Sequence, residues 1–371
     1  MARGSSAPAP ELPPDDVIRE ILLRLPPHPA CFQRASLVCK HWRRLVRDPD
    51  FLRGLRARHL HGAQPLLGFF DQDASFAPAG EPPDRATVAH LSSRPSRTRV
   101  LGCCHGRVLL CSTLDPLQLL VWDPMTPGPL PVFMGPRSPH LENRFVPLPI
   151  RGSFICVHDD DSHDGEDCRS RPFRVVILSF SGNLMFAGMY SSKESRWHLA
   201  TVQPDVSSIG IQPGVLVEDT MYWLSPNQNR FVEYDIDTNQ LRLIQGLPTD
   251  PYGPYDYYQG VKAGGGYLGV AAVRGSCFEL FALTADSNGT MMWTKCLGAK
   301  LDEHLSPPLK AIEVSDEDGN TMLFETADGV FELELQSMEV NKVLQSDVVA
   351  LSTMIAYRSL YVAGRSGGND G

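Results

Sequence analysis

The sequence predicts a chain of two unlike parts, a short helical segment followed by a mainly β domain. Gly and Pro contribute 31 residues each to a chain of 371, and that share favours many turns over long helices. Hydrophobic residues make up 42% of the chain, which is enough to bury a sizeable core. Residues 1–60 hold eleven Arg or Lys and six Asp or Glu, a balance of +5, so the other 311 residues carry −14. Charge and composition therefore change together near residue 60.

Four helices are expected in the first segment. Asp15 and Asp16 stand where a helix N-terminus favours acidic side chains, and the apolar residues that follow them fall on one helical face. Pro26 and Pro27 end this helix, because proline lacks the amide donor. Pro29 suits the first turn of the next helix, and Asp48 caps the last one. The expected helices cover residues 17–25, 29–35, 38–47 and 51–60.

The first segment resembles an F-box, most closely those of plant F-box proteins. The resemblance is carried by Leu12-Pro13-Pro14-Asp15-Asp16-Val17-Ile18-Arg19-Glu20-Ile21-Leu22-Leu23-Arg24-Leu25-Pro26, by Ala35-Ser36-Leu37-Val38-Cys39-Lys40-His41-Trp42-Arg43-Arg44-Leu45 and by Asp48-Pro49-Asp50-Phe51. The opening Pro13-Pro14 is one residue longer than the usual Leu-Pro. The resemblance implies docking on a Skp-family adaptor, which joins the chain to a cullin–RING ubiquitin ligase. The residues it implies at the adaptor interface are Leu12, Pro14, Ile18, Ile21, Leu22, Leu25, Pro26, Val38, Cys39, Trp42 and Leu45.

Physical reasoning supports a docking role for this segment. A helical unit of about 45 residues cannot bury all of its Ile, Leu, Val and Trp alone, so a surplus apolar face is expected to take a partner. Two alternatives remain open. The segment could be the core of a helical cap on the second domain, or its basic residues could bind nucleic acid, although no base-reading signature accompanies them. Those basic residues are Lys40, Arg43, Arg44, Arg47, Arg53, Arg56 and Arg58.

Beyond residue 60 the chain consists of short apolar runs separated by turn residues, which predicts paired strands. The clearest pairs are 106–111 with 119–124, 220–224 with 231–235, and 322–325 with 330–334. A strand followed by a small or polar turn recurs with gaps of 52, 56, 56, 47 and 52 residues, at Asp71, Asp123, Ser179, Asp235, Ala282 and Glu334. A period near 50 is typical of a six-bladed kelch-like β-propeller. Strands near 357–362 are expected to close against the first blade, and a β-sandwich or split barrel is the competing fold.

This second region also resembles the β-propeller-like regions that follow the F-box in many plant proteins. The phrases Gly106-Arg107-Val108-Leu109-Leu110 and Leu120-Val121-Trp122-Asp123-Pro124 carry that resemblance. It implies substrate recruitment without naming the substrate. The predicted organisation is a disordered N-terminus at 1–10, an F-box at 11–60, a substrate-recruitment domain at 65–363 and a disordered tail at 364–371.

Three motifs that suggest a catalytic or ligand-binding site lack the neighbouring residues that such a site requires. Residues 264–269 have the spacing of a dinucleotide loop, but a strand rather than a helix follows, which favours a blade turn. Residues 364–368 have the residue pattern of a nucleophile elbow, but the helix that must follow such an elbow is not expected here. The acidic run 159–167 would place Arg171 at the bidentate position of a calcium loop. No catalytic residue, metal site or cofactor is predicted.

A tyrosine-rich loop is the candidate for target binding. Residues 250–258 hold four of the ten Tyr in the chain, and Tyr offers a large contact area with few rotatable bonds. At least two of these rings are expected to be accessible at a channel mouth. The alternative is that the rings pack between two blades and only seal a gap. The candidate residues are Tyr252, Tyr255, Tyr257 and Tyr258.

The predicted function is the substrate-recognition subunit of a Skp–cullin–F-box ubiquitin ligase, without catalysis of its own. The alternatives are a propeller-fold hydrolase or sugar-modifying enzyme with accessory helices, and an F-box scaffold outside a ligase. No secretory signal and no run of 18 apolar residues is evident, and nine Cys without a C-x-x-C pair fit reduced thiols. We therefore expect a cytoplasmic or nuclear protein that binds the adaptor, through it the cullin and RING subunits, and a target protein. Neither nucleic acid nor membrane is expected as a partner.

Overall fold

The structure is a computed structural model. It describes residues 13–59, 65–80, 96–104, 106–114, 118–125, 132–141, 144–145, 151–156, 172–181, 183–203, 214–225, 230–248, 254–301, 305, 310–314, 321–345 and 354–359. Leu12, the predicted disordered ends, the acidic run 159–167 and residues 364–368 lie outside these ranges, and so does Tyr252.

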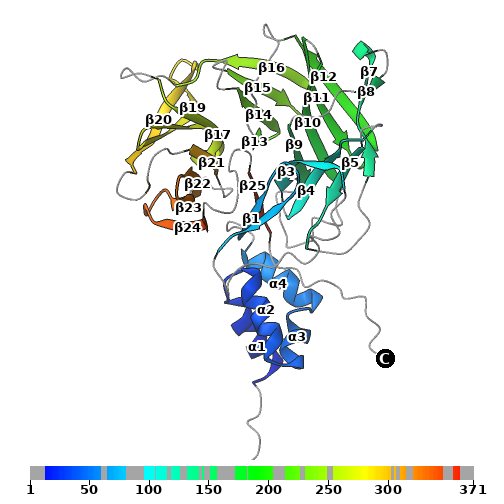
Figure 1. The fold of residues 1–371 in the computed structure, drawn as a ribbon, viewed down its shortest axis with the longest axis vertical. Helices are drawn as coiled ribbons and strands as arrows, with labels where there is room; N and C mark the ends of the chain where they lie inside the picture. Colours follow the sequence, from blue (N-terminus) through cyan, green and yellow to red (C-terminus); the bar gives the residue numbers. More distant parts are fainter. Residues whose placement is uncertain are drawn as a thin grey trace, which may run out of the picture.

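Four helices form a compact unit at the N-terminal end, beside strand β1 of the larger domain (Figure 1). They are α1 (Asp15–Leu23), α2 (Pro29–Val38), α3 (Lys40–Leu45) and α4 (Pro49–His59). Their core is a single cluster in which Phe32 of α2 and Phe51 of α4 meet edge to face, with ring centroids 6.1 Å apart. The expected third helix is shorter than predicted, because Cys39 adopts an extended conformation and separates α2 from α3.

The larger domain consists of six main sheets arranged in a ring (Figure 1). Five of them have four strands, and one has three. Blade 1 contains β2 (Phe76–Pro78), β1 (Leu66–Phe70) and β25 (Ile355–Arg358). Blade 2 contains β3 (Thr98–Cys104), β4 (Arg107–Ser112), β5 (Gln118–Trp122) and β6 (Val132–Met134). Blade 3 contains β9 (Arg151–Cys156), β10 (Phe173–Ser181), β11 (Leu184–Ser191) and β12 (Arg196–Val202).

The remaining blades follow in chain order. Blade 4 contains β13 (Gly214–Val217), β14 (Thr220–Ser225), β15 (Arg230–Asp235) and β16 (Gln240–Gln245). Blade 5 contains β17 (Tyr257–Ala263), β18 (Tyr267–Arg274), β19 (Cys277–Ala285) and β20 (Met291–Lys300). Blade 6 contains β21 (Lys310–Val314), β22 (Thr321–Thr326), β23 (Gly329–Glu334) and β24 (Val340–Gln345). A small hairpin of β7 (Arg137–Ser138) and β8 (Arg144–Phe145) flanks the short 3₁₀ turn η2 (Pro139–Leu141).

Each blade is buried on both faces, which explains the continuous apolar runs of the sequence. Strand β4 shows this directly: Val108 and Leu110 pack toward blade 1, whereas Leu109 and Cys111 pack toward blade 3. Side chains alternate between the two faces of a strand, so a strand between two neighbours must be apolar at every position. Separate apolar clusters join blades 1 and 2, 2 and 3, 3 and 4, 4 and 5, 5 and 6, and 6 and 1. The domain is therefore a six-bladed β-propeller, as predicted.

The last strand closes the ring against the first blade, as the sequence predicted. Strand β25 pairs antiparallel with β1, with Phe70 opposite Ile355. The fully buried Tyr357 donates a hydrogen bond from its hydroxyl to the Gly106 carbonyl of blade 2, at 3.0 Å. Phe69 and Ala356 of blade 1 pack with Leu323 of blade 6. Residues far apart in sequence thus hold the two ends of the propeller together.

The predicted hairpins of the blades are confirmed. Strands β4 and β5, β14 and β15, and β22 and β23 pair as expected. The glycine run that resembles a dinucleotide loop is the turn between β17 and β18, where Gly265 and Gly266 have φ of +78° and +79°. Such angles suit glycine and build a tight turn.

Candidate functional site

The helical unit exposes a group of large apolar side chains on α1 and at the end of α2. Val17 and Ile21 of α1 are 44% and 49% exposed, and Leu37 and Val38 of α2 are 74% and 62% exposed. Val17 and Ile21 are one helical turn apart and share a face of α1. We call these four residues the apolar surface of the helical unit. Exposed apolar residues concentrated in so small a unit mark an interaction site.

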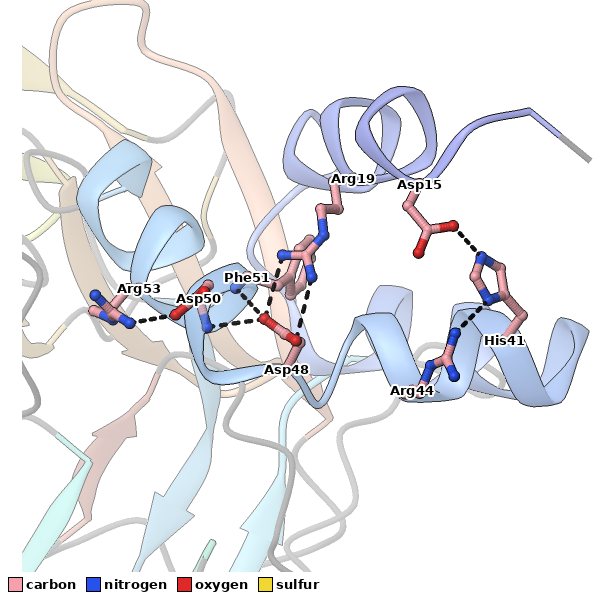
Figure 2. A network of polar contacts seen from close by, with 8 residues as sticks. All are labelled: Asp15, Arg19, His41, Arg44, Asp48, Asp50, Phe51 and Arg53. Atoms are coloured by element: carbon pink, nitrogen blue, oxygen red, sulfur yellow. Dashed lines mark hydrogen bonds and ion pairs between the residues drawn. The ribbon is translucent and has the colours of Figure 1, made fainter.

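A contact between Asp15 and His41 brings the first turn of α1 close to the start of α3, and hence to the junction with α2. His41 Nε2 lies 2.8 Å from Asp15 Oδ1, and Arg44 donates to His41 Nδ1 at 3.2 Å (Figure 2). His41 follows Val38 by only three residues. The contact therefore ties together the two segments that carry the apolar surface.

Asp48 fixes the other end of the unit by joining α1 to α4. Its Oδ1 accepts the backbone N–H groups of Asp50 and Phe51 at 3.0 and 3.2 Å, which caps α4. Both of its oxygens also contact the Arg19 guanidinium of α1 at 3.2 Å (Figure 2). Partial burial raises the pKa of Asp48, but the Phe51 N–H and the Arg19 charge outweigh this, so the pKa lies below its usual value.

Three of the predicted adaptor contacts are wrong. Ile18, Leu22 and Leu45 are at most 2% exposed and belong to the core of the helical unit. These three side chains hold the helices of the unit together and are not part of its surface. Val17 and Leu37, which were not predicted as contacts, are exposed instead.

The other predicted contacts lie at or near the surface. Ile21, Val38, Pro14 and Pro26 are exposed, whereas the remaining three are half-buried: Leu25, Cys39 and Trp42. The Cys39 thiol accepts the backbone N–H of Trp42 at 3.4 Å and so caps α3. The Trp42 ring packs against the core, and its buried Nε1 has no hydrogen-bond partner among the described residues.

Tyr255 is part of the propeller core, so its prediction as an exposed binding residue is wrong. The ring is 7% exposed and packs with Ala272 and Phe281. Its hydroxyl donates to the Glu279 carboxylate, and the Arg274 guanidinium lies 5.3 Å from the ring centre. Tyr255 therefore packs inside blade 5 rather than in a gap between two blades.

Tyr257 and Tyr258 are half-buried and anchored within the protein. The Tyr257 hydroxyl donates to Gln259 Oε1 at 3.2 Å, and its ring packs against the cluster between blades 5 and 6. Burial is the largest cause that raises the pKa of Tyr257, followed by the charge of Glu325. The Tyr258 hydroxyl donates to the Pro248 carbonyl at 3.2 Å. The tyrosine-rich segment is thus mainly structural in its described part.

Among the described residues, no group of three or more His, Cys, Asp or Glu side chains is placed to hold a metal ion. No helix in the same part of the chain is long and apolar enough to span a membrane.

Comparison with known proteins identifies the helical unit. Residues 14–54 match the F-box domain family, so the prediction of an N-terminal F-box is confirmed. An F-box/LRR-repeat/kelch-repeat protein of Arabidopsis thaliana is 24% identical over 237 residues, which cover 62% of this chain. The match spans 59% of the length of that relative.

Among solved structures, the chain is distantly similar to chains of three different kinds. An Aleuria aurantia lectin bound to α-methyl-L-fucoside is 13% identical, with a TM-score of 0.37, over 66% of this chain and 75% of the lectin. The β-propeller domain of Cps50 (Swd1) from Myceliophteria thermophila is 9% identical, with a TM-score of 0.38, over 76% and 86% of the two chains. A chain of a nidogen–laminin complex is 10% identical, with a TM-score of 0.40, over 75% and 92%.

Proposed function

Because residues 14–54 form an F-box domain, we propose that this protein is the substrate-recognition subunit of a Skp–cullin–F-box ubiquitin ligase. In this proposal the F-box docks on a Skp-family adaptor, which links it to the cullin and RING subunits. The propeller holds the target protein. Ubiquitin transfer takes place outside this chain, and the chain contributes by bringing the target close.

The observation that carries the proposal is the apolar surface of the helical unit. Val17, Ile21, Leu37 and Val38 remain exposed although the same helices bury a complete core of their own. Large apolar side chains that stay in water lower the solubility of a free domain, and they become stabilising when a partner covers them. A helical adaptor surface that packs on α1 and the end of α2 accounts for their exposure.

The arrangement of the two domains suits a recruiter. The F-box stands to one side of the ring (Figure 1), so an adaptor bound to α1 and α2 leaves most of the propeller surface open. Loops at the two ends of a propeller are carried by rigid blades, which makes them suitable for target binding. We propose a cytoplasmic or nuclear location for the complex, where ubiquitin ligases of this kind act.

Reconstitution tests the proposal. The full chain is co-expressed with a Skp-family adaptor, and the complex is then mixed with cullin and RING subunits and analysed by size exclusion. A stoichiometric complex that recruits the cullin supports the proposal. Absence of adaptor binding at micromolar concentration contradicts it. Adaptor binding without cullin recruitment points instead to an F-box scaffold outside a ligase.

A further inference from the structure

The outer strand of blade 5 is an open sheet edge at the rim of the propeller (Figure 1). Strand β20 pairs with β19 on one side, and none of the strands that the structure describes pairs with its other side. Seven of its ten residues are exposed, compared with one of seven in β12 of blade 3. Strands β12 and β16 contact each other, and the Val343 carbonyl of β24 accepts the Gly80 N–H of blade 1 at 3.0 Å. Strand β20 is thus less covered than these three outer strands.

A turn and a bulge delimit the regular part of this edge to residues 291–295. The turn of residues 286–290 joins β19 to β20. The pairing of the two strands shifts its register between Leu280 and Phe281, which leaves Cys296 as the extra residue of a β-bulge on β20. The regular segment therefore has five residues, with Trp293 at its midpoint.

Alternate residues of this segment direct their backbone groups away from the blade. The Asp286 N–H donates to the Thr290 carbonyl at 2.9 Å across the turn, so these two opposite residues form a hydrogen-bonded pair. Hydrogen-bonded and non-hydrogen-bonded pairs alternate along an antiparallel ladder. Met291, Trp293 and Lys295 consequently belong to non-hydrogen-bonded pairs with β19. Their N–H and C=O groups face the open side of the edge.

Exposed apolar side chains gather at the same end of blade 5. Strands β18 and β20 both pair antiparallel with β19, so they begin at the same end of the blade. Tyr267 begins β18, and Met291 and Met292 begin β20. They are three of the four exposed large apolar residues in the described part of the propeller. An open edge with apolar side chains is a template for pairing with another strand.

The charge of the edge suits a second copy of this chain as the partner. Residues 61–371 carry −14, so two copies repel each other over most of the propeller surface. Residues 291–300 contain no Asp or Glu. The Lys295 ammonium pairs with Glu279 of its own chain, so its charge is already compensated. Two copies therefore approach each other at this edge with little repulsion.

We propose that the chain forms a two-fold symmetric dimer in which β20 of one copy pairs antiparallel with β20 of the other. The two-fold axis passes through Trp293. Met291 of each copy then lies opposite Lys295 of the other copy, and each such pair exchanges two hydrogen bonds between outward-facing backbone groups. Both copies contribute the same residues, so the contact closes as a dimer. This inference does not depend on the proposed function.

The side chains of the edge are compatible with this register. The Trp293 ring lies back over blade 4, where it packs 6.0 Å from the Phe231 ring and donates from Nε1 to the Gly246 carbonyl at 2.7 Å. Met292 comes opposite Thr294 of the other copy, in the type of pair whose side chains are closer together. The two Lys295 residues lie at opposite ends of the paired segment, so no like charges face each other.

Sedimentation velocity of the full chain tests the proposal at concentrations from about 1 to about 100 µM, because an interface of this small size gives a weak dimer. Every chain carries Val38→Asp, which prevents association through the apolar surface of the helical unit. We expect a dimer with a dissociation constant in the micromolar range. Met292→Lys weakens it about tenfold, because it removes an apolar contact and brings two like charges onto one face near the axis.

Leu114→Lys is the matched control for Met292→Lys. Leu114 has the same exposed fraction, 51%, and follows β4 of blade 2, so this variant keeps the affinity of the dimer. Both variants keep the melting temperature of the parent chain, since both side chains are exposed.

Disulfide formation between copies tests the register. Two single variants, Met292→Cys and Thr294→Cys, are made in a Cys296→Ser background, because Cys296 is itself exposed. The proposed pair brings positions 292 and 294 of different copies to a Cα separation of about 4.5 Å, which a disulfide spans. We expect a covalent dimer in the mixture of the two variants and not in either variant alone. A mixture of Met292→Cys with Leu114→Cys is the control and remains unlinked.

Three results contradict the proposal. A chain that stays monomeric over the whole concentration range does so, and an extended segment of a target protein is then the occupant to test at this edge. A dimer that is equally stable in Met292→Lys and Leu114→Lys forms through another surface. A dimer that gives no disulfide in the mixture of Met292→Cys and Thr294→Cys does not have β20 paired around Trp293.

Discussion

The helical unit and the propeller differ in how completely they bury their large apolar side chains. The helical unit has one core cluster and, within residues 13–59, leaves Val17, Ile21, Leu37 and Val38 exposed. The described part of the propeller is several times larger, yet its exposed large apolar residues are also only four: Leu114, Tyr267, Met291 and Met292. Its blades bury both faces against their neighbours. The small unit thus leaves an apolar surface uncovered, whereas the blades of the ring cover one another.

The two regions therefore differ in the kind of surface that they can offer to a partner. A sheet whose two faces are both buried can offer only its loops, strand ends and outer edge. The helical unit can offer a face. We therefore expect binding by the F-box to depend on apolar contact, and binding by the propeller to depend on its loops and strand ends.

The largest effect is expected for Tyr255→Ala, which tests whether the propeller is self-contained. Removing a large buried aromatic ring costs about 3–5 kcal/mol, and it also leaves the Glu279 carboxylate without one of its donors. We expect a clear fall in the melting temperature of the propeller, with adaptor binding unchanged. Differential scanning calorimetry measures the first quantity and titration with the adaptor the second.

Tyr267→Ala is the matched control for this substitution. Tyr267 lies in the same blade but is 50% exposed, and surface changes of this kind shift stability by only about 0.5 kcal/mol. Equal melting temperatures of the two variants would show that the Tyr255 ring is not core, and the tyrosine loop would again be a candidate for target binding.

Leu22→Ala tests the core of the helical unit. Leu22 is fully buried, and truncation of such a Leu costs about 2–5 kcal/mol. A unit of this size has little stability to spare, so we expect the helices to unfold and adaptor binding to fall, while the propeller keeps its melting temperature. Circular dichroism at a helix-sensitive wavelength follows the first change.

The neighbouring Ile21→Ala variant separates folding from contact. Ile21 is about half exposed, so its loss is expected to weaken adaptor binding without unfolding the helices. If Leu22→Ala instead leaves the helical signal intact, the division between core and docking face on α1 is wrong.

Val38→Asp tests the apolar surface itself. A carboxylate at the centre of an apolar interface must lose its water, and we expect a loss of roughly 2 kcal/mol, about thirtyfold in adaptor affinity. Stability should hold, because Val38 is 62% exposed in the free chain. Leu114→Asp places the same change on the propeller at a residue that is 51% exposed. Equal adaptor affinities of the two variants would show that the apolar surface is not the docking site.

The fold was largely predictable because the repeat in the sequence reflects the repeat of the blades. Asp123, Asp235, Ala282 and Glu334 mark the third strands of their blades or the residue just after them, whereas Asp71 and Ser179 mark second strands. The marks are therefore not equivalent positions, and their near-constant spacing comes from blades of similar length. Strand β25, from the C-terminal end of the chain, is the inner strand of the first blade. The first blade needs such a strand, which is why closure by the end of the chain could be predicted.

The docking residues were less predictable. The helical periodicity predicted the apolar face of α1. It could not distinguish Ile18 and Leu22, which face the core, from the exposed Ile21. That division depends on where Phe32 and Phe51 lie, which is tertiary information.

The smallest effect is expected at Asp48, which tests how far the helical unit depends on polar contacts. Asp48→Ala removes both the cap of α4 and the contact with Arg19, at a cost of about 1–2 kcal/mol. Asp48→Asn keeps a good capping side chain and removes only the charge, so it should cost less, about 0.5 kcal/mol. Urea denaturation followed by helical circular dichroism measures both variants against wild type.

The dependence of these differences on pH identifies the charge as the cause. The pKa of Asp48 is lowered in the folded chain, so the folded state binds this proton less readily than the unfolded state, whose Asp has a pKa of about 3.9. The stabilisation by the carboxylate is complete above that value and is lost as the pH falls through the lower pKa of the folded state. The gap between wild type and Asp48→Asn should therefore be constant above about pH 5 and close below about pH 4. Asp50→Asn disrupts only an exposed pair with Arg53, so its difference in stability from wild type should not depend on pH in this way. If the stability difference between wild type and Asp48→Asn instead persists unchanged into acid, Asp48 acts by its shape rather than by its charge.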